Sequence, residues 1–250
     1  MNRRIRWTIG AIGAAAALVG PVAVAAPTSA SNPAPQTPAR EDIRIAVVTH
    51  GEPGSTFWAV VQNGAEAAAR DYGVTVDYSN PDTFDLVRIT ELIDAAIASE
   101  PDGLVVSIPD VDAIGPSITE AIEAGIPVVS MNSGGDVWQD LGVLTHIGSD
   151  EFVAGTAAGE RLVELGVTNA ICVNDEVGNL ALDIRCDSAK AALEEAGGTM
   201  SVVPAPTGDP IGQQNAVAAA LQADPTIDGA LSMSPDAAIP SMQAIADAGA

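Results

Sequence analysis

Basic residues are scarce in this chain of 250 residues, and their scarcity excludes one class of partner. Lys and Arg together number 10 against 33 Asp and Glu, which gives a formal net charge of −23. A negative field of this size repels phosphate backbones, so we do not expect nucleic acid as a partner. We interpret the acidic surface as a solvated one that favours solubility.

The motifs that mark catalytic and metal sites are also missing. The sequence has no G-x-S-x-G elbow, no G-x-G-x-x-G fingerprint and no zinc-ligand spacing. Its two histidines, His50 and His146, lack H-x-x-x-H spacing, and we interpret them as hydrogen-bonded or exposed side chains. We therefore expect a protein that is not an enzyme and that needs no cofactor or metal.

The first forty residues differ in composition from the rest. Three arginines precede an apolar, Ala-rich run that ends in the small-x-small sequence Ala23-Val24-Ala25. This order is typical of a secretory signal peptide, here residues 1–26, although the run also approaches the length of an uncleaved membrane anchor. Residues 27–41 are rich in Pro, Ser and Ala and are predicted to form a flexible tether. We expect an exported protein on the periplasmic or extracellular side of the membrane.

Export bears on the only two cysteines, Cys172 and Cys186. An isolated pair in an exported protein is more often bridged than free, so we predict a disulfide. Closing a loop of this size stabilises the fold by about 3 kcal/mol in the chain-entropy model. The alternative is a pair of buried free thiols.

From residue 43 onward, short β-branched runs alternate with helical segments. This alternation implies parallel strands joined by right-handed crossovers, hence an α/β fold with doubly wound sheets. We predict two similar lobes, residues 42–148 and 149–250, the second of them incomplete. Asp112 is expected to cap the third helix. The predicted strands are 43–49, 74–78, 103–108, 127–131, 145–148, 169–174, 199–204 and 229–233, and the predicted helices are 59–72, 85–99, 112–123, 152–165, 182–196, 211–223 and 237–248.

Short motifs at the junctions of these segments are shared with one family. They are Ser55-Thr56-Phe57-Trp58, Pro101-Asp102-Gly103-Leu104, Ala124-Gly125-Ile126-Pro127-Val128-Val129, Ile147-Gly148-Ser149-Asp150, Ala154-Gly155, Asp228-Gly229-Ala230 and Ser234-Pro235-Asp236-Ala237-Ala238. With these motifs in one register from residue 43 to residue 250, the chain resembles sugar-binding proteins of the ribose/galactose type. The resemblance implies the class I periplasmic-binding-protein fold, whose members serve ABC importers.

The chain departs from the family pattern in three places. Asn132-Ser133 stands where many pentose and hexose binders carry an Asp-Arg pair, which predicts a site with less charge. Pro235-Asp236 stands where the family usually has Asn-Asp. The family also continues through further strand–helix units beyond the position of Ala250, so we expect a chain truncated at its C-terminus.

A sugar combines hydroxyl groups with apolar CH faces, so its site needs flat aromatic rings edged by hydrogen-bonding groups. Phe57 and Trp58 are adjacent in a chain with only eight aromatic residues. They follow the first strand, at the sheet edge where α/β proteins bind ligands, and the resemblance also places them at the ligand. The alternative is that one of the two packs the lobe. Trp138 is a third, weaker candidate.

Polar candidates lie after other strands. Arg185 aligns with the family arginine that hydrogen-bonds sugar hydroxyls, although it could instead pair with Asp183 or Asp187. Asn132 offers a donor and an acceptor, and Asp236 either accepts from hydroxyls or caps the last helix. Ser55 and Ser133 offer hydroxyls. The predicted ligand-binding set is Ser55, Phe57, Trp58, Asn132, Ser133, Arg185 and Asp236.

The resemblance implies a solute-binding protein that captures a sugar or polyol between two lobes. It would act as a monomer and deliver the ligand to an ABC-transporter permease in the membrane. A ligand-sensing receptor domain for a membrane-bound signalling partner is the alternative. The effector domain of a transcription regulator shares the fold but needs a DNA-binding helix pair, and this chain begins with an export signal instead.

Overall fold

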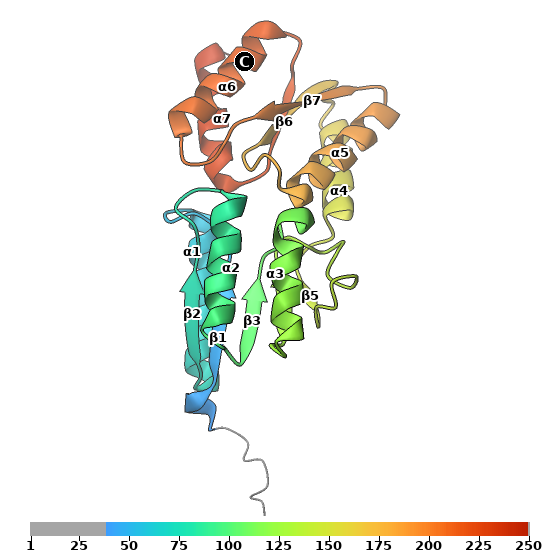
Figure 1. Cartoon of the computed structure of the whole chain (residues 1–250). Helices are drawn as coiled ribbons and strands as arrows, with labels where there is room; N and C mark the ends of the chain where they lie inside the picture. Colours follow the sequence, from blue (N-terminus) through green and yellow to red (C-terminus); the bar gives the residue numbers. More distant parts are fainter. Residues whose placement is uncertain (1–38, 250) are drawn as a thin grey trace, which may run out of the picture. The chain divides into compact units, whose positions relative to one another are not determined.

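A computed structural model describes residues 39–249 of the chain, which form two parallel β-sheets with helices on their faces (Figure 1). The expected signal peptide and the tether up to residue 38 lie outside the described residues. The first sheet has the order β2-β1-β3-β4-β5 and the second β7-β6-β8, with all pairs parallel. The strands are β1 (Arg44–Val48), β2 (Thr75–Ser79), β3 (Gly103–Val106), β4 (Val128–Met131), β5 (His146–Ile147), β6 (Asn169–Asn174), β7 (Thr199–Pro204) and β8 (Gly229–Ser232).

Within each sheet, helices connect successive strands as crossovers, except that a loop joins β4 to β5. This arrangement confirms the predicted doubly wound α/β fold. We call β1–β5 with α1–α3 the first lobe, and β6–β8 with α4–α7 the second lobe. Among residues 39–249, no helix combines the length and the apolar character needed to span a bilayer. The helices are α1 (Thr56–Tyr72), α2 (Leu86–Ala98), α3 (Val111–Glu123), α4 (Glu151–Glu164), α5 (Leu180–Glu195), α6 (Pro210–Ala223) and α7 (Pro235–Ala248), and a 3-10 turn, η1 (Arg40–Asp42), precedes β1.

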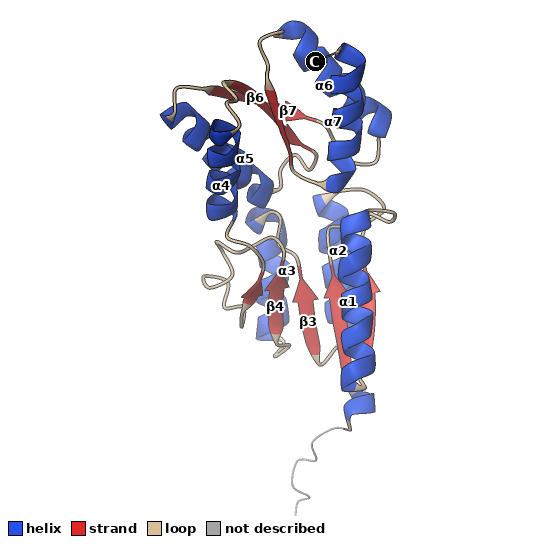
Figure 2. Ribbon diagram, turned by 180° about the vertical axis from the view of Figure 1, so that it is seen from behind, coloured by secondary structure: helices blue, strands red, loops and turns tan. Residues whose placement is uncertain are grey.

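The core of the first lobe lies between its sheet and the helices α2 and α3. Ile89, Ile93 and Ile97 recur every four residues on α2 and are buried against the sheet, beside Ile114 and Ile118 of α3. This spacing places apolar side chains on one face of a helix. Helix α1 lies on the opposite face of the sheet, as the two opposed views show (Figures 1 and 2).

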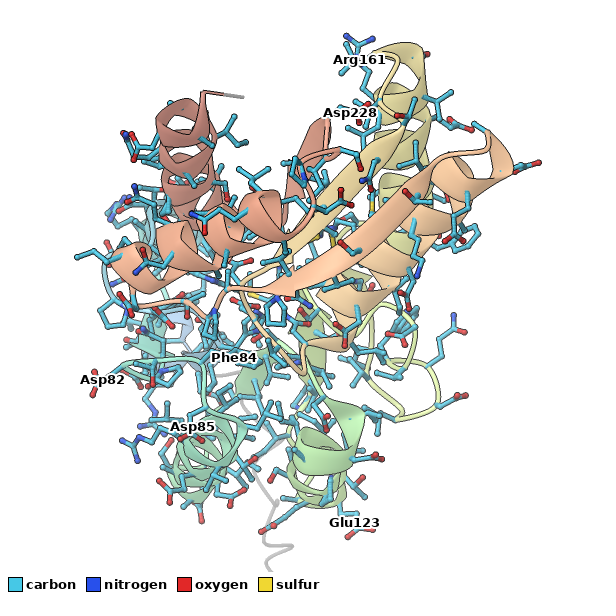
Figure 3. All side chains as sticks on the ribbon, turned by 90° about the horizontal axis from the view of Figure 1, so that it is seen from above. Asp82, Phe84, Asp85, Glu123, Arg161 and Asp228 are labelled. Atoms are coloured by element: carbon cyan, nitrogen blue, oxygen red, sulfur yellow. A yellow bond between two sulfur atoms is a disulfide. The ribbon has the colours of Figure 1, made fainter. Side chains whose placement is uncertain are left out.

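The cap of α3 differs from the prediction. Asp110, rather than Asp112, accepts the N–H of Ala113 at 2.8 Å. An N-cap side chain must lie just outside the helix to reach the free N–H groups of the first turn, and Asp112 already belongs to that turn. Asp85 caps α2 in the same way, and Figure 3 shows it beside Phe84.

The second sheet is buried on both faces, as a parallel sheet between two helical layers should be. Along β6, Ala170 and Cys172 face α4 and α5, whereas Ile171 and Val173 face α6 and α7. Figure 2 shows these two helix pairs on opposite sides of the sheet. At its outer end, Asp228 accepts the N–H groups of Thr168 and Asn169, far from Phe84 (Figure 3).

A disulfide ties β6 to α5. The sulfur atoms of Cys172 and Cys186 are bonded, and both residues are buried in the core beneath α4 and α5. The predicted bridge is therefore present, and the free-thiol alternative is wrong.

Two glycines let α4 approach α5 closely. A Cβ at Gly155 would lie 2.0 Å from the Ser188 hydroxyl and 2.3 Å from the Arg185 carbonyl oxygen. A Cβ at Gly159 would lie 2.3 Å from the Ala189 carbonyl oxygen. Because only glycine fits at this distance, the two residues set the position of α5, which carries Arg185.

Removing the bridge tests its contribution to stability. We expect the Cys172→Ala/Cys186→Ala variant to lose about 3 kcal/mol of unfolding free energy, because the open loop gains entropy in the unfolded state. Urea unfolding with and without reductant measures this. Reductant should lower the midpoint of the wild type but leave that of the variant unchanged, and equal midpoints for both proteins would contradict a stabilising bridge.

Alanine substitutions at two helical glycines test the close packing of α4. Gly155→Ala should cost about 1–3 kcal/mol, because the methyl group has no space against α5. Gly64 is the matched control, since it is exposed within α1 and a Cβ there meets nothing within 4 Å. Gly64→Ala should stabilise by about 0.5–1 kcal/mol through helix propensity alone. Urea unfolding of both variants measures whether the free energy of unfolding falls in one and rises in the other. A change of the same sign in both would argue against the close approach of α4 to α5.

Candidate functional site

The carboxyl ends of both sheets open onto one cavity of about 540 Å³. Residues that follow β1, β4, β6, β7 and β8 line it, so both lobes contribute. All seven predicted ligand-binding residues are among them: Ser55, Phe57, Trp58, Asn132, Ser133, Arg185 and Asp236.

Phe57 and Trp58 form an aromatic corner at the start of α1. Their rings meet edge to face, with centroids 5.1 Å apart. Trp58 is 8% exposed and covers Gly51, where a Cβ would lie 2.1 Å from the indole ring. Phe57 is 42% exposed and offers the larger free face. The indole is thus largely a packing element, and the phenyl ring is the apolar surface available to a ligand.

Trp138 lies elsewhere. It packs against the core of the first lobe and is not among the residues that line the cavity. Its proposed contact with a ligand is therefore wrong. The loop after β4 packs on the core of the first lobe, and the Trp138 ring is half-buried there.

Arg185 forms an ion pair, but not with the neighbours on its own helix. Its Nε donates to Glu151 Oε2 at 2.6 Å, and its Nη2 contacts the same oxygen. Its Nη1 lies 3.4 Å from the carbonyl oxygen of Met233. The expected alternative partners, Asp183 and Asp187, are not involved. The pair fixes the guanidinium at the cavity wall with its side chain 23% exposed.

His50 joins the two lobes from a buried position. Its Nδ1 lies 2.8 Å from the Ser107 hydroxyl, and its Nε2 lies 3.2 Å from Glu176 Oε2 in the second lobe. Burial alone would raise the pKa of Glu176, but the His50 ring, Asn179 and Arg185 together hold that pKa below its usual value. His50 is thus the hydrogen-bonded histidine that the sequence predicted. Within residues 39–249, no three His, Cys, Asp or Glu side chains converge as a metal site requires.

Further contacts cross between the lobes. The Ser55 hydroxyl donates to Asp236 Oδ2 at 2.6 Å, and the Thr207 hydroxyl donates to Glu52 Oε1. The expected capping role of Asp236 is wrong, because Ser234 caps α7 by accepting the N–H of Ala237. Asp236 is thus free to accept hydrogen bonds at the mouth of the cavity.

Asn132 and Ser133 occupy the end of β4. Asn132 has φ 60°, a left-handed conformation that Asn tolerates better than most residues. The buried Ser133 hydroxyl lies 3.0 Å from Asn132 Oδ1 and 3.4 Å from Asn179 Oδ1. The pair brings amide and hydroxyl groups to the cavity in place of charges.

The cavity nevertheless carries more charge than Asn132-Ser133 predicted. Asp175, which sequence reasoning missed, follows β6 and is 3% exposed. Its Oδ2 accepts from the Ser234 hydroxyl, whereas its Oδ1 is buried without a hydrogen-bond partner. Burial raises the pKa of Asp175 to about 6. The signal that could have found it is a carboxylate directly after a buried strand.

The chain matches one family over most of its length. Residues 45–250 match the family described as the periplasmic binding protein domain. No curated protein sequence matches the chain.

Several solved structures are similar. A carbohydrate transporter from Acidothermus cellulolyticus 11B, in complex with myo-inositol, is 37% identical with a TM-score of 0.79, and the match covers 83% of this chain and 71% of that one. An ABC sugar transporter (periplasmic sugar binding protein) from Legionella pneumophila is 24% identical, with a TM-score of 0.77 and coverage of 83% and 76%. An ABC transporter solute binding protein from Agrobacterium vitis, bound with alpha-D-tagatopyranose, is 22% identical, with a TM-score of 0.72 and coverage of 83% and 72%. These likenesses and the family match confirm the predicted resemblance.

The raised pKa of Asp175 makes stability depend on pH. Protons bind the folded state more tightly than the unfolded state, so ionisation of Asp175 destabilises the fold above about pH 6, and this cost disappears as the pH falls towards 4. Asp175→Asn should therefore be more stable than the wild type at neutral pH, by up to about 3 kcal/mol. Urea unfolding at neutral pH and near pH 4 measures the difference. An advantage that stays constant with pH would contradict a buried ionised Asp175.

Proposed function

Since the chain belongs to the periplasmic binding protein domain family, whose members are binding proteins, we propose that it captures a sugar or polyol between its two lobes. It would act as an exported monomer that hands the ligand to the permease of an ABC importer. Residues 42–148 and 149–250 would be the two units that move relative to each other.

The observation that carries this proposal is the composition of the cavity. Phe57 supplies an exposed apolar ring from the first lobe, and Arg185 supplies a fixed guanidinium from the second. Asn132 adds an amide to the lining. An apolar ring face together with a planar hydrogen-bond donor is what a ring of hydroxyls with CH faces requires. The volume of about 540 Å³ lies in the range of small-molecule sites.

The contacts between the lobes support capture by closure. Ser55 with Asp236, Thr207 with Glu52 and His50 with Glu176 each join residues of different lobes around the cavity rim or floor. A ligand that touches both lobes favours the arrangement in which these contacts form. The closed form would then be the one a permease recognises.

The solved relative from Acidothermus cellulolyticus guides the choice of ligand. It is 37% identical to this chain and its structure contains myo-inositol. We therefore propose cyclic polyols and monosaccharides as the ligand class.

Isothermal titration with myo-inositol and a panel of pentoses and hexoses tests the proposal. At least one of them should bind, and Phe57→Ala should weaken it about tenfold because the ring face is lost. Tyr72→Ala is the matched control, since Tyr72 is an exposed aromatic at the far end of α1 and does not line the cavity. Binding of no member of the panel, or an equal effect of the two substitutions, would count against the proposal.

A further inference from the structure

The cavity has a marked excess of carboxylates. Five of its lining residues are acidic, whereas Arg185 is the only Lys or Arg among the described residues that line it. The five are Glu52, Glu151, Asp175, Glu176 and Asp236.

Two of these carboxylates have a basic partner. Glu151 pairs with Arg185, and Glu176 pairs with His50. Among residues 39–249, the other three form no ion pair. Neighbouring charges act on two of the three, because Glu176 and Asp236 contribute to the raised pKa of both Glu52 and Asp175, behind burial as the main cause.

The protein compensates two of the three unpaired carboxylates in other ways. Glu52 accepts the backbone N–H of Phe84 at 3.1 Å as well as the Thr207 hydroxyl. Asp236 lies in the first turn of α7, where the helix dipole favours a negative charge, and it accepts the Ser55 hydroxyl.

Asp175 is the exception. It lies in the loop between β6 and α5, outside the first turn of any helix, and its donors are the Ser234 hydroxyl and, with a smaller effect, its own backbone N–H. Asp175 lines the cavity, and its Oδ1 is buried without a hydrogen-bond partner. A buried carboxylate oxygen without a donor is costly, so its occurrence on a residue that lines the cavity points to a donor that arrives with the ligand.

We propose that the ligand is an amino-substituted polyol, an amino sugar or aminocyclitol, whose protonated amine binds Asp175 Oδ1. This inference rests on the proposed function and specifies its ligand class. The hydroxyl-bearing ring would lie against Phe57 and Arg185, as the capture of a polyol requires.

A neutral polyol satisfies this site less well. One of its hydroxyls can donate to Oδ1, but the charge of Asp175 stays uncompensated when the ligand displaces water. An ammonium group adds a positive charge and three donors at the same position. It therefore offsets the charge of Asp175 and weakens the repulsion that Asp175 experiences from Glu176 and Asp236.

Matched ligand pairs test the inference by isothermal titration near neutral pH. The pairs are glucose with glucosamine, and myo-inositol with an amino-deoxy-inositol, and N-acetylglucosamine serves as the uncharged amide control. In at least one pair, we expect the amine to bind ten or more times tighter than the matching hydroxyl compound. Acetylation of the amine should remove that preference.

Variants locate the preference at one residue. Asp175→Asn keeps the shape and the acceptor for Ser234, and it should reduce the ratio of amine to hydroxyl affinity to less than about threefold. Asp187→Asn is the matched control, because Asp187 is an exposed acid on α5 outside the cavity, and it should leave the ratio unchanged. Thermal unfolding and circular dichroism verify that both variants are folded.

The outcomes separate this inference from the proposed function. If the neutral member of each pair binds at least as tightly as the matching amine, the proposed function stands and the amine inference is overturned. An amine preference that survives Asp175→Asn overturns the assignment to Asp175. If neither member of any pair binds and the wider sugar panel also fails, both proposals fall.

Discussion

Parallel strand pairing is the constraint on which the rest of this structure depends. Each crossover returns the chain to the same direction, so all strands of a sheet end at one edge and the next helix begins there. Loops that follow strands of both sheets meet at a single cavity for this reason. Residues as distant in sequence as Ser55 and Asp236 thereby come within hydrogen-bonding distance, although no local motif links them.

This convergence brings several carboxylates to the cavity, and the structure stabilises some of these carboxylates better than others. Helices α1, α5 and α7 begin at the cavity, and their N-terminal N–H groups and dipoles favour anions there. Asp236 gains from this arrangement, whereas Asp175 lies before the helix that follows it. Asp175 gains little from the fold, so we infer that ligand binding, rather than stability, accounts for its place in the cavity.

Much of the fold could be predicted from periodicity, because β-branched runs and helical spacing are local signals. Strands β6 and β7 have the predicted ends, whereas α1, α5 and α7 begin two or three residues earlier than predicted, since their polar caps resemble loop residues. The site was harder to predict. Arg185 pairs with Glu151 on another helix, because residues two positions away on α5 do not share its face. Burial also determines where Trp138 packs, and it raises the pKa of Asp175. Burial depends on residues distant in sequence, so neither feature has a local signal.

The disulfide has a consequence for the cavity as well as for the core. Cys186 adjoins Arg185, and Cys172 lies three residues before Asp175, so a single covalent bond ties together the strand and the helix that carry these two polar groups. If the bond favours the geometry that holds a solute, a bound solute must by reciprocity make the bond harder to reduce. The redox state of the surroundings would then act on solute capture without touching the solute.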